Sequence, residues 1–238
     1  MASGHGTRVI PEKEAHLKRK WIHIVCWIVA VAAWNGMAAY AQSDVAASVV
    51  GAFSGSVTSG ANEQNPSDAA GAMIEVRHIN SSWVGFEAAY SYFRASQMYT
   101  YAAPVVLPFP CPSSGCGPNG YAQPMAVSAN AHAFTGDWII SRKMHNFSPF
   151  ALAGVGFLLA VPSGGQMHTG TAAEFLLNFG AGVDWKLSSH LGLRLQDRVN
   201  LYKSPQMVTD NLYYYDPANL GGTYMHTQEP AIGVYYRF

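Results

Sequence analysis

Over long stretches of the chain every second residue is apolar, and this alternation constrains the fold more than any other feature of the sequence. Within residues 171–187 the odd-numbered positions from Ala173 to Leu187 are all apolar, whereas most even-numbered positions are small, polar or charged. Residues 190–202 repeat the pattern with a row of leucines on one side. Because successive side chains of a strand point to opposite faces, the pattern predicts strands with one apolar and one polar face.

The same pattern predicts eight strands along the chain. Their expected ranges are 45–58, 69–79, 82–95, 124–142, 146–160, 171–187, 190–202 and 224–238. The connections alternate between long and short. The long ones are 59–68, 96–123, 161–170 and 203–223, and the short ones are 80–81, 143–145 and 188–189. Antiparallel neighbours joined in this way place all long loops at one end and all tight turns at the other, as in outer-membrane barrels.

The apolar faces are expected to point outward, toward lipid. Only 12% of the 238 residues are charged, against about 25% in an ordinary soluble domain, so a water-soluble barrel of the lipocalin type is disfavoured. An eight-stranded barrel has room inside only for side chains, and Phe175, Phe179 and Trp185 would overfill it. The sequence therefore predicts an all-β fold, an eight-stranded antiparallel up-and-down transmembrane β-barrel, closed so that no backbone group is left unpaired in hydrocarbon.

The first 41 residues are expected to be a cleaved signal peptide. Lys18, Arg19 and Lys20 precede an apolar run over residues 21–33, which is shorter than the roughly 20 residues that a spanning helix needs. The triplet of residues 39–41, Ala-Tyr-Ala, provides a small-residue exit. An uncleaved membrane anchor is the alternative. The barrel domain is then residues 42–238, and the absence of net positive charge on the chain disfavours nucleic acid as a partner.

The polar face of the strands carries charges that should lie inside the barrel. Four acids and four bases are predicted to form this lumen charge network: Glu75, Arg77, Glu87, Glu174, Asp184, Lys186, Arg194 and Arg198. Opposite charges in a narrow lumen should pair, because an unpaired buried charge is costly. A filled, salt-bridged lumen argues against a wide pore. Aromatic residues near strand ends are predicted to form interfacial girdles: Trp83, Tyr90, Tyr92, Trp138, Trp185, Tyr202, Tyr235 and Tyr236.

Two of the long loops carry features of their own. Loop 96–123 holds Cys111 and Cys116, which can close a small disulfide loop in an oxidising compartment; metal binding by this pair is weakly supported, because no further ligand lies nearby. Loop 203–223 contains three consecutive tyrosines at 213–215. Exposed tyrosines suit contact with an extracellular partner or glycan, and an ordered lid that only stabilises the rim is the alternative.

The chain closes with an alternating row at Ile232, Val234, Tyr236 and Phe238. This row looks like the C-terminal insertion signal of bacterial outer-membrane proteins, which the outer-membrane assembly machinery recognises. Together with the eight strands, and with short phrases in residues 154–156, 178–183 and 192–195, the chain resembles the OmpA-like small outer-membrane β-barrel family over residues 45–238. The resemblance implies a location in the bacterial outer membrane, contact with outer-membrane lipid, and a structural or surface-interaction role. No peptidoglycan-binding domain is expected.

Two other functions remain open as alternatives: a narrow channel for small solutes, and a lipid-modifying enzyme. Outer-membrane barrel enzymes use Ser with His and a carboxylate. The candidates of this kind are His168 with Thr169, His132, and Ser128 or Ser141, with Ser128, Asn130 and His132 sharing one strand face. No deacylase-like His-x-Ser sequence, phosphate loop or metal-ligand spacing is present. The chain is therefore expected to be non-enzymatic and to need no cofactor or metal.

Overall fold

The computed structural model describes residues 42–59, 62–80, 83–101, 125–163, 169–207 and 223–238. The predicted signal peptide and the two cysteines lie outside these ranges. Nearly all of the described chain is in strands, as the alternation predicts. They are β1 (Gln42–Ser54), β2 (Val57–Ser59), β3 (Asn62–Pro66), β4 (Ala69–Ile79), β5 (Val84–Tyr101), β6 (Met125–Ser141), β7 (Phe147–Pro162), β8 (Ala172–Lys186), β9 (Leu191–Lys203) and β10 (Tyr224–Arg237). Among these residues no helix is long and apolar enough to cross a membrane.

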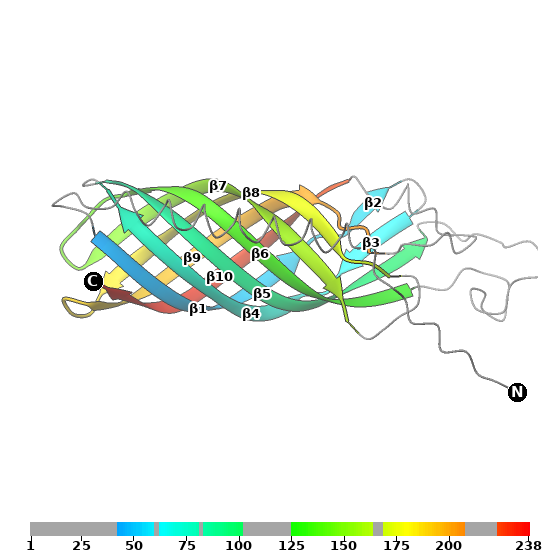
Figure 1. Cartoon of the computed structure of the whole chain (residues 1–238), viewed down its shortest axis with the longest axis horizontal. Coiled ribbons are helices and arrows are strands. Elements are labelled where there is room, and N and C mark those ends of the chain that lie inside the picture. Colours follow the sequence, from blue (N-terminus) through cyan, green and yellow to red (C-terminus); the bar gives the residue numbers. More distant parts are fainter. Residues whose placement is uncertain (1–41, 60–61, 81–82, 102–124, 164–168, 208–222) are drawn as a thin grey trace, which may run out of the picture. The chain divides into compact units, whose positions relative to one another are not determined.

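Eight of these strands close into an antiparallel barrel, so the predicted fold class is confirmed (Figure 1). Neighbours along the chain pair with each other from β4 to β10, the last strand β10 pairs with β1, and β1 pairs with β4. The seam between β1 and β10 extends from Asp44 opposite Arg237 to Ser54 opposite Thr227. Pairing of β5 with β6 completes the ring, which leaves the eight long strands without an open edge.

The prediction that residues 59–68 form a loop is wrong. Most of it is strand, because β2 continues β1 after a short break and pairs with β3, which in turn pairs with the last five residues of β5. Strand β5 is correspondingly longer than its predicted range and reaches Tyr101. Turn-forming residues such as Asn65 and Pro66 suggest a loop, but Pro66 lies beyond the part of β3 that pairs with β2, and such an edge position tolerates a missing N–H. The barrel wall is therefore extended on one side by this hairpin.

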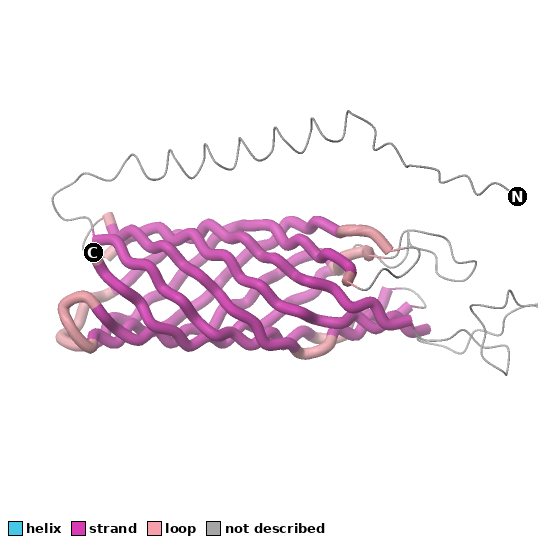
Figure 2. Tube along the Cα trace, turned by 60° about the horizontal axis from the view of Figure 1, so that its bottom comes forward, coloured by secondary structure: helices cyan, strands magenta, loops and turns pink. Residues whose placement is uncertain are grey.

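The short turns gather at one end of the barrel, together with the end of β10 (Figures 1 and 2). We call this the turn end, and the opposite end the loop end. Each turn is closed by a backbone hydrogen bond: Asn80 N–H donates to Val84 O at 3.1 Å, Met144 to Phe147 at 3.1 Å and Leu187 to Leu191 at 3.0 Å. The asymmetry of loop lengths read from the sequence is thus an asymmetry between two ends of one barrel.

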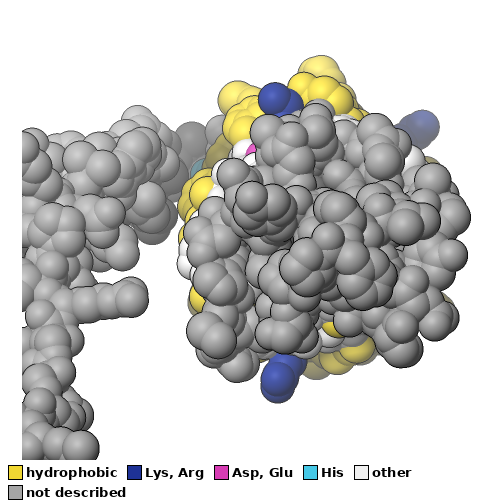
Figure 3. All heavy atoms as spheres, turned by 90° about the vertical axis from the view of Figure 1, so that its right-hand side faces the viewer, with side chains coloured by type: hydrophobic (Ala, Val, Ile, Leu, Met, Phe, Trp, Pro, Cys, Tyr) yellow, Lys and Arg dark blue, Asp and Glu magenta, His cyan; other side chains and the backbone are white. Residues whose placement is uncertain are grey.

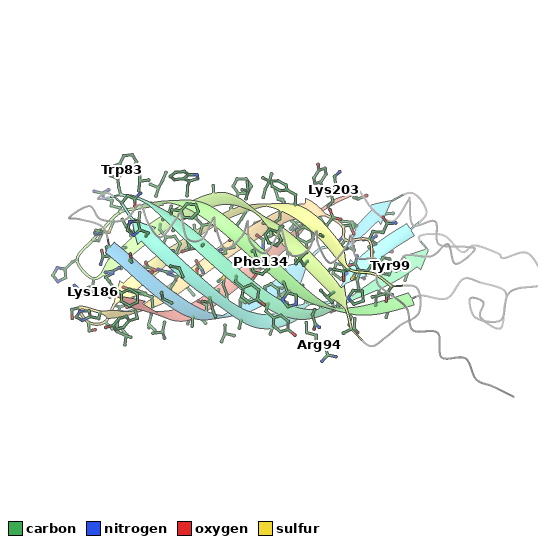
Figure 4. The ribbon with its side chains drawn as sticks, in the orientation of Figure 1. Trp83, Arg94, Tyr99, Phe134, Lys186 and Lys203 are labelled. Carbon is green, nitrogen blue, oxygen red and sulfur yellow. The ribbon has the colours of Figure 1, made fainter. Side chains whose placement is uncertain are left out.

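The outside of the barrel is apolar. Outward side chains such as Val49, Ile74, Phe175, Leu195 and Ile232 are each more than half exposed. In the view onto the loop end, described hydrophobic side chains show around the rim with few Lys or Arg among them (Figure 3). Figure 4 places Trp83 and Lys186 toward the turn end, and Arg94 and Lys203 on opposite sides of the barrel toward the loop end. An outer surface of this kind is solvated by lipid.

Most of the predicted girdle aromatics lie on this outer face, but two do not. Trp83, Trp138 and Trp185 are more than half exposed near the turn end. Tyr202 and Tyr235 are buried inside the barrel, 8% and 2% exposed. Both were assigned by their place near a strand end, whereas alternation along the strand decides which face a side chain occupies.

Candidate functional site

The inward side chains divide the lumen into two halves of different chemistry. The half nearer the turn end holds a cluster of buried charges, which we call the ionic layer, and the half nearer the loop end is lined mainly by small apolar side chains. The ionic layer consists of Asp44, Glu75, Arg77, Glu87, Asp137, Asp184, Arg194 and Arg198. None of these residues is more than 5% exposed.

Arg77 joins two of the acids across the barrel. Its Nε donates to Glu87 Oε2 at 2.8 Å on the neighbouring strand, and its NH1 group donates to Asp184 Oδ2 at 2.9 Å. The guanidinium lies over the Phe150 ring, 4.1 Å from its centroid. A planar cation that is stacked on a ring and bonded to two carboxylates keeps its geometry, because one of its faces and two of its edge nitrogens are in contact.

Arg194 lies at the centre of the layer. Its Nε donates to Asp184 Oδ1 at 2.8 Å, and its NH2 group donates to Asp44 Oδ1 at 2.8 Å. Its NH1 group is 3.7 Å from Glu75 Oε2 and 3.6 Å from Glu87 Oε2. One fully buried guanidinium therefore contacts carboxylates from β1, β4, β5 and β8, which links these four strands through the lumen.

Arg198 completes the layer on the side of the loop end. Its NH2 group donates to Glu75 Oε1 at 3.0 Å and also bonds Glu87 Oε1, and its NH1 group is 3.4 Å from Asp137 Oδ2. Neutral side chains also bind these carboxylates. Gln196 Nε2 donates to Glu75 Oε1 at 2.6 Å, the oxygen that Arg198 also binds, and Asn178 Nδ2 donates to Asp137 Oδ1 at 3.0 Å.

The structure brings together six of the eight residues predicted for the lumen charge network. Lys186 is exposed near the turn end, so its assignment to the lumen is wrong; β8 ends there, beyond the buried layer (Figure 4). Glu174 is half-buried near the other end of β8 and lies outside the ionic layer. Alternation gives the inward face along a whole strand, but only the middle of that face is enclosed.

Sequence reasoning missed three buried acids, Asp44, Asp137 and Glu229. Asp44 comes one residue before the first predicted strand. Asp137 is on β6, where polar residues occur on both faces and the alternation is unclear. Glu229 follows the same inward parity as Ala231 and Tyr235, a signal that was available in the sequence. Its neighbours Gln228 and Pro230 interrupt the apolar outward row and obscured that signal.

The loop-end half of the lumen contains a cavity of about 80 Å³. Its walls come from seven of the barrel strands and include six alanines: Ala52, Ala95, Ala129, Ala131, Ala133 and Ala160. Toward the ionic layer it is bounded by Asn200 and Glu229, and toward the loop end by Pro205 and Met207. The cavity therefore lies on the loop-end side of the ionic layer.

Among the candidate catalytic residues that the structure describes, no hydrogen bond joins a Ser to a His. On β6, Ser128 and His132 bond residues of the neighbouring strand: Ser128 Oγ lies 3.0 Å from Ser96 Oγ, and His132 Nδ1 lies 2.9 Å from Tyr90 OH. Asn130 accepts a hydrogen bond from Tyr92 at 3.1 Å. Ser141 is buried at the other end of β6. These contacts form a polar ladder along the wall of the barrel.

The remaining site predictions fall on the last strand or outside the described residues. Ile232, Val234 and Tyr236 lie on the outer face at the end of β10 and Phe238 follows it, and each of the four is between 46% and 74% exposed. Their role as an insertion signal stays a prediction. Cys111, Cys116 and His168 lie outside the described ranges. Within those ranges, no group of three or more His, Cys, Asp and Glu side chains could hold a metal ion.

No protein-family model matches the chain, and no curated protein matches it. Solved structures do match. Neisserial surface protein A has a TM-score of 0.51 at 12% identity, over 83% of this chain and 97% of that chain. The outer membrane protein OprG from Pseudomonas aeruginosa has a TM-score of 0.50 at 10% identity, over 83% of this chain and 95% of that chain. At such low identity the likeness is one of fold.

Proposed function

We propose, from the premise that residues 42–238 have the fold of the small bacterial outer-membrane β-barrels, that this protein is a sealed barrel of that membrane with a structural or surface-interaction role. The closed backbone and the apolar outer face support a location in a lipid bilayer. The fold and the row at the end of β10 support the bacterial outer membrane, and insertion through its assembly machinery.

The observation that carries the proposal is the ionic layer. Eight charged side chains, each at most 5% exposed, fill the turn-end half of the lumen, and ion pairs link the charges of β1, β4, β5, β6, β8 and β9. A continuous path for hydrated solutes would have to separate these pairs, which costs several kcal/mol for each charge left buried and alone. The narrow channel is therefore disfavoured relative to the sealed barrel.

Planar-bilayer recording of the purified barrel tests the seal. We expect no discrete openings, while the same sample migrates on a gel as a folded, heat-modifiable barrel. That migration is the control, because silence from unfolded protein would mean nothing. Discrete, reproducible openings would contradict the sealed lumen and support the channel.

The surface-interaction role is supported by the loop end. There the β2–β3 hairpin and the end of β5 extend the wall on one side, and the sequence adds three long connections. Replacing the three tyrosines 213–215 by serine should reduce binding of intact cells to an extracellular partner or glycan without changing the amount of folded barrel. Equal binding by the variant would remove these tyrosines from the proposal.

The non-enzymatic character is supported by the separation of Ser128, His132 and Ser141. Mass spectrometry of lipid A from cells with and without overexpressed protein tests it. We expect identical lipid A species. A change in acyl-chain number or length that depends on the protein would contradict the proposal.

A further inference from the structure

We propose that the cavity in the loop-end half of the lumen is a binding site for a small organic amine, with the ammonium group toward Asn200 and Glu229 and the apolar body against the alanine wall. This site goes beyond the structural and surface role proposed above. It does not require a pore, because the cavity lies on the loop-end side of the ionic layer.

The alanine wall makes space that the barrel cannot remove. The number of strands fixes the diameter of the barrel, so an inward position holding alanine leaves unfilled volume where a larger side chain would pack. Ala131 packs against two separate apolar clusters, one around Phe93 and one around Leu176, and thus lies where the two walls meet. The surface offered to a ligand there is made mainly of methyl groups.

The floor of the cavity offers an unused acceptor. Asn200 is 3% exposed, and its Nδ2 donates to Glu229 Oε1 at 2.6 Å. A carboxylate only accepts, so this bond fixes the orientation of the amide. Asn200 Oδ1 is then buried without a hydrogen-bond partner among the described residues. A buried acceptor of this kind lacks a donor, and leaving it unsatisfied costs about 1–3 kcal/mol.

The charges around the floor favour a cation as that donor. Among the described residues, the buried acids are Asp44, Glu75, Glu87, Asp137, Asp184 and Glu229, and the buried bases are Arg77, Arg194 and Arg198, six against three. Arg198 makes its ion pairs with Glu75, Glu87 and Asp137, and its charge acts on Glu229 only from beyond ion-pair distance. The hydrogen bond that the structure records on Glu229 comes from the neutral Asn200. A ligand ammonium would supply both positive charge and N–H donors.

The roof limits the size of the ligand. Met207 is 2% exposed and belongs to the apolar cluster that includes Tyr99 and Val127, and Tyr99 OH donates to Pro205 O at 3.4 Å. The residues that follow β9 therefore cover the cavity on the side of the loop end. A volume of about 80 Å³ suits a body of a few carbon atoms rather than a long acyl chain.

NMR of the refolded chain in detergent micelles tests the proposal with isobutylamine as the probe. We expect saturable shifts at the methyl groups of Ala131 and Ala133, which line the cavity, and none that saturate at the outward Ala88 and Ala153. Isobutanol, which has the same body without the charge, should bind at least tenfold more weakly.

Two variants test separately the contact with the ammonium group and the contact with the apolar body of the ligand. Glu229→Gln should weaken the binding of isobutylamine at least tenfold and leave the binding of isobutanol unchanged. Ala131→Leu should abolish binding of both, and Ala88→Leu on the outer face is its matched control. Heat-modifiable migration shows that each variant is folded.

Three results would overturn the proposal: equal affinity for amine and alcohol, an unchanged affinity in Ala131→Leu, and shifts that appear only at the outward alanines. If Glu229→Gln does not fold, the comparison of the two probes and Ala131→Leu still decide. The bilayer recording tests the ionic layer alone. A failure of the amine-binding test therefore does not affect the proposal of a sealed barrel, and openings in the bilayer recording would not affect the proposed amine site.

Discussion

The two halves of the lumen share the same strands and the same ring closure, yet one is filled and the other is hollow. Near the turn end, arginine, Phe150 and Tyr235 occupy the space, with glycines opposite them. Near the loop end, alanines stand at the inward positions and a cavity remains. The comparison shows that, in a barrel of fixed width, the volume of the inward side chains alone decides whether a part of the lumen is closed or contains a cavity.

Among the substitutions that test this contrast, removal of the Arg194 guanidinium should change the free energy of unfolding most. Arg194→Ala removes the ion pair of Asp44 and leaves Asp184 with Arg77 alone, and we expect a loss of about 3–5 kcal/mol in the free energy of unfolding because uncompensated negative charge remains buried. Urea unfolding in detergent, followed by tryptophan fluorescence, measures it. A loss below about 1 kcal/mol would show that the ionic layer does not stabilise the barrel.

A methyl group added in the filled half should be the next largest change. At Gly182 a Cβ would lie 2.5 Å from Phe150 Cζ and 2.5 Å from the Leu195 carbonyl oxygen, so backbone must shift. We expect Gly182→Ala to lower the free energy of unfolding by about 1–3 kcal/mol. Gly136→Ala is the control, since its nearest atom is Phe86 Cζ at 3.2 Å on the outer face. Equal effects of the two substitutions would remove the distinction between tight interior and open surface.

In the hollow half an added side chain should have the opposite sign. Ala131→Leu fills part of the cavity, and we expect a gain of about 0.5–2 kcal/mol in the free energy of unfolding. The midpoint of urea unfolding measures it beside Gly182→Ala. A loss as large as that of Gly182→Ala would mean that the loop-end half is packed as tightly as the turn-end half.

The smallest effect is expected at Lys186, the basic residue that sequence reasoning placed inside. Because it is exposed, Lys186→Ala should change the free energy of unfolding by less than about 0.5 kcal/mol. It serves as the matched control for Arg194→Ala, since both remove one positive charge. A loss comparable with that of Arg194→Ala would place Lys186 within the buried network after all.

The sequence predicted the barrel well because alternation is a local property of each strand. The predicted range 69–79 coincides with β4. The six charges of the ionic layer that the alternation predicts lie on strands where the alternation is clear. Asp137 was missed because Asn130 and His132 make the outer face of β6 polar near the loop end. The cavity could not be predicted, because it depends on alanines from strands distant in the chain that meet only in the closed ring.

The seam between β1 and β10 sets the order in which this molecule can be made. The first strand finds its second neighbour only when the last strand has arrived, and until then both strands present an unsatisfied edge. Arg194 reaches Asp44 across 150 residues, and that bond too waits for the ring. Ring closure should thus occur as a single late step of assembly. A chain without its final strand would have neither an enclosed interior nor a continuous apolar surface for lipid. Until the ring closes, such a chain would be open to proteolysis and aggregation.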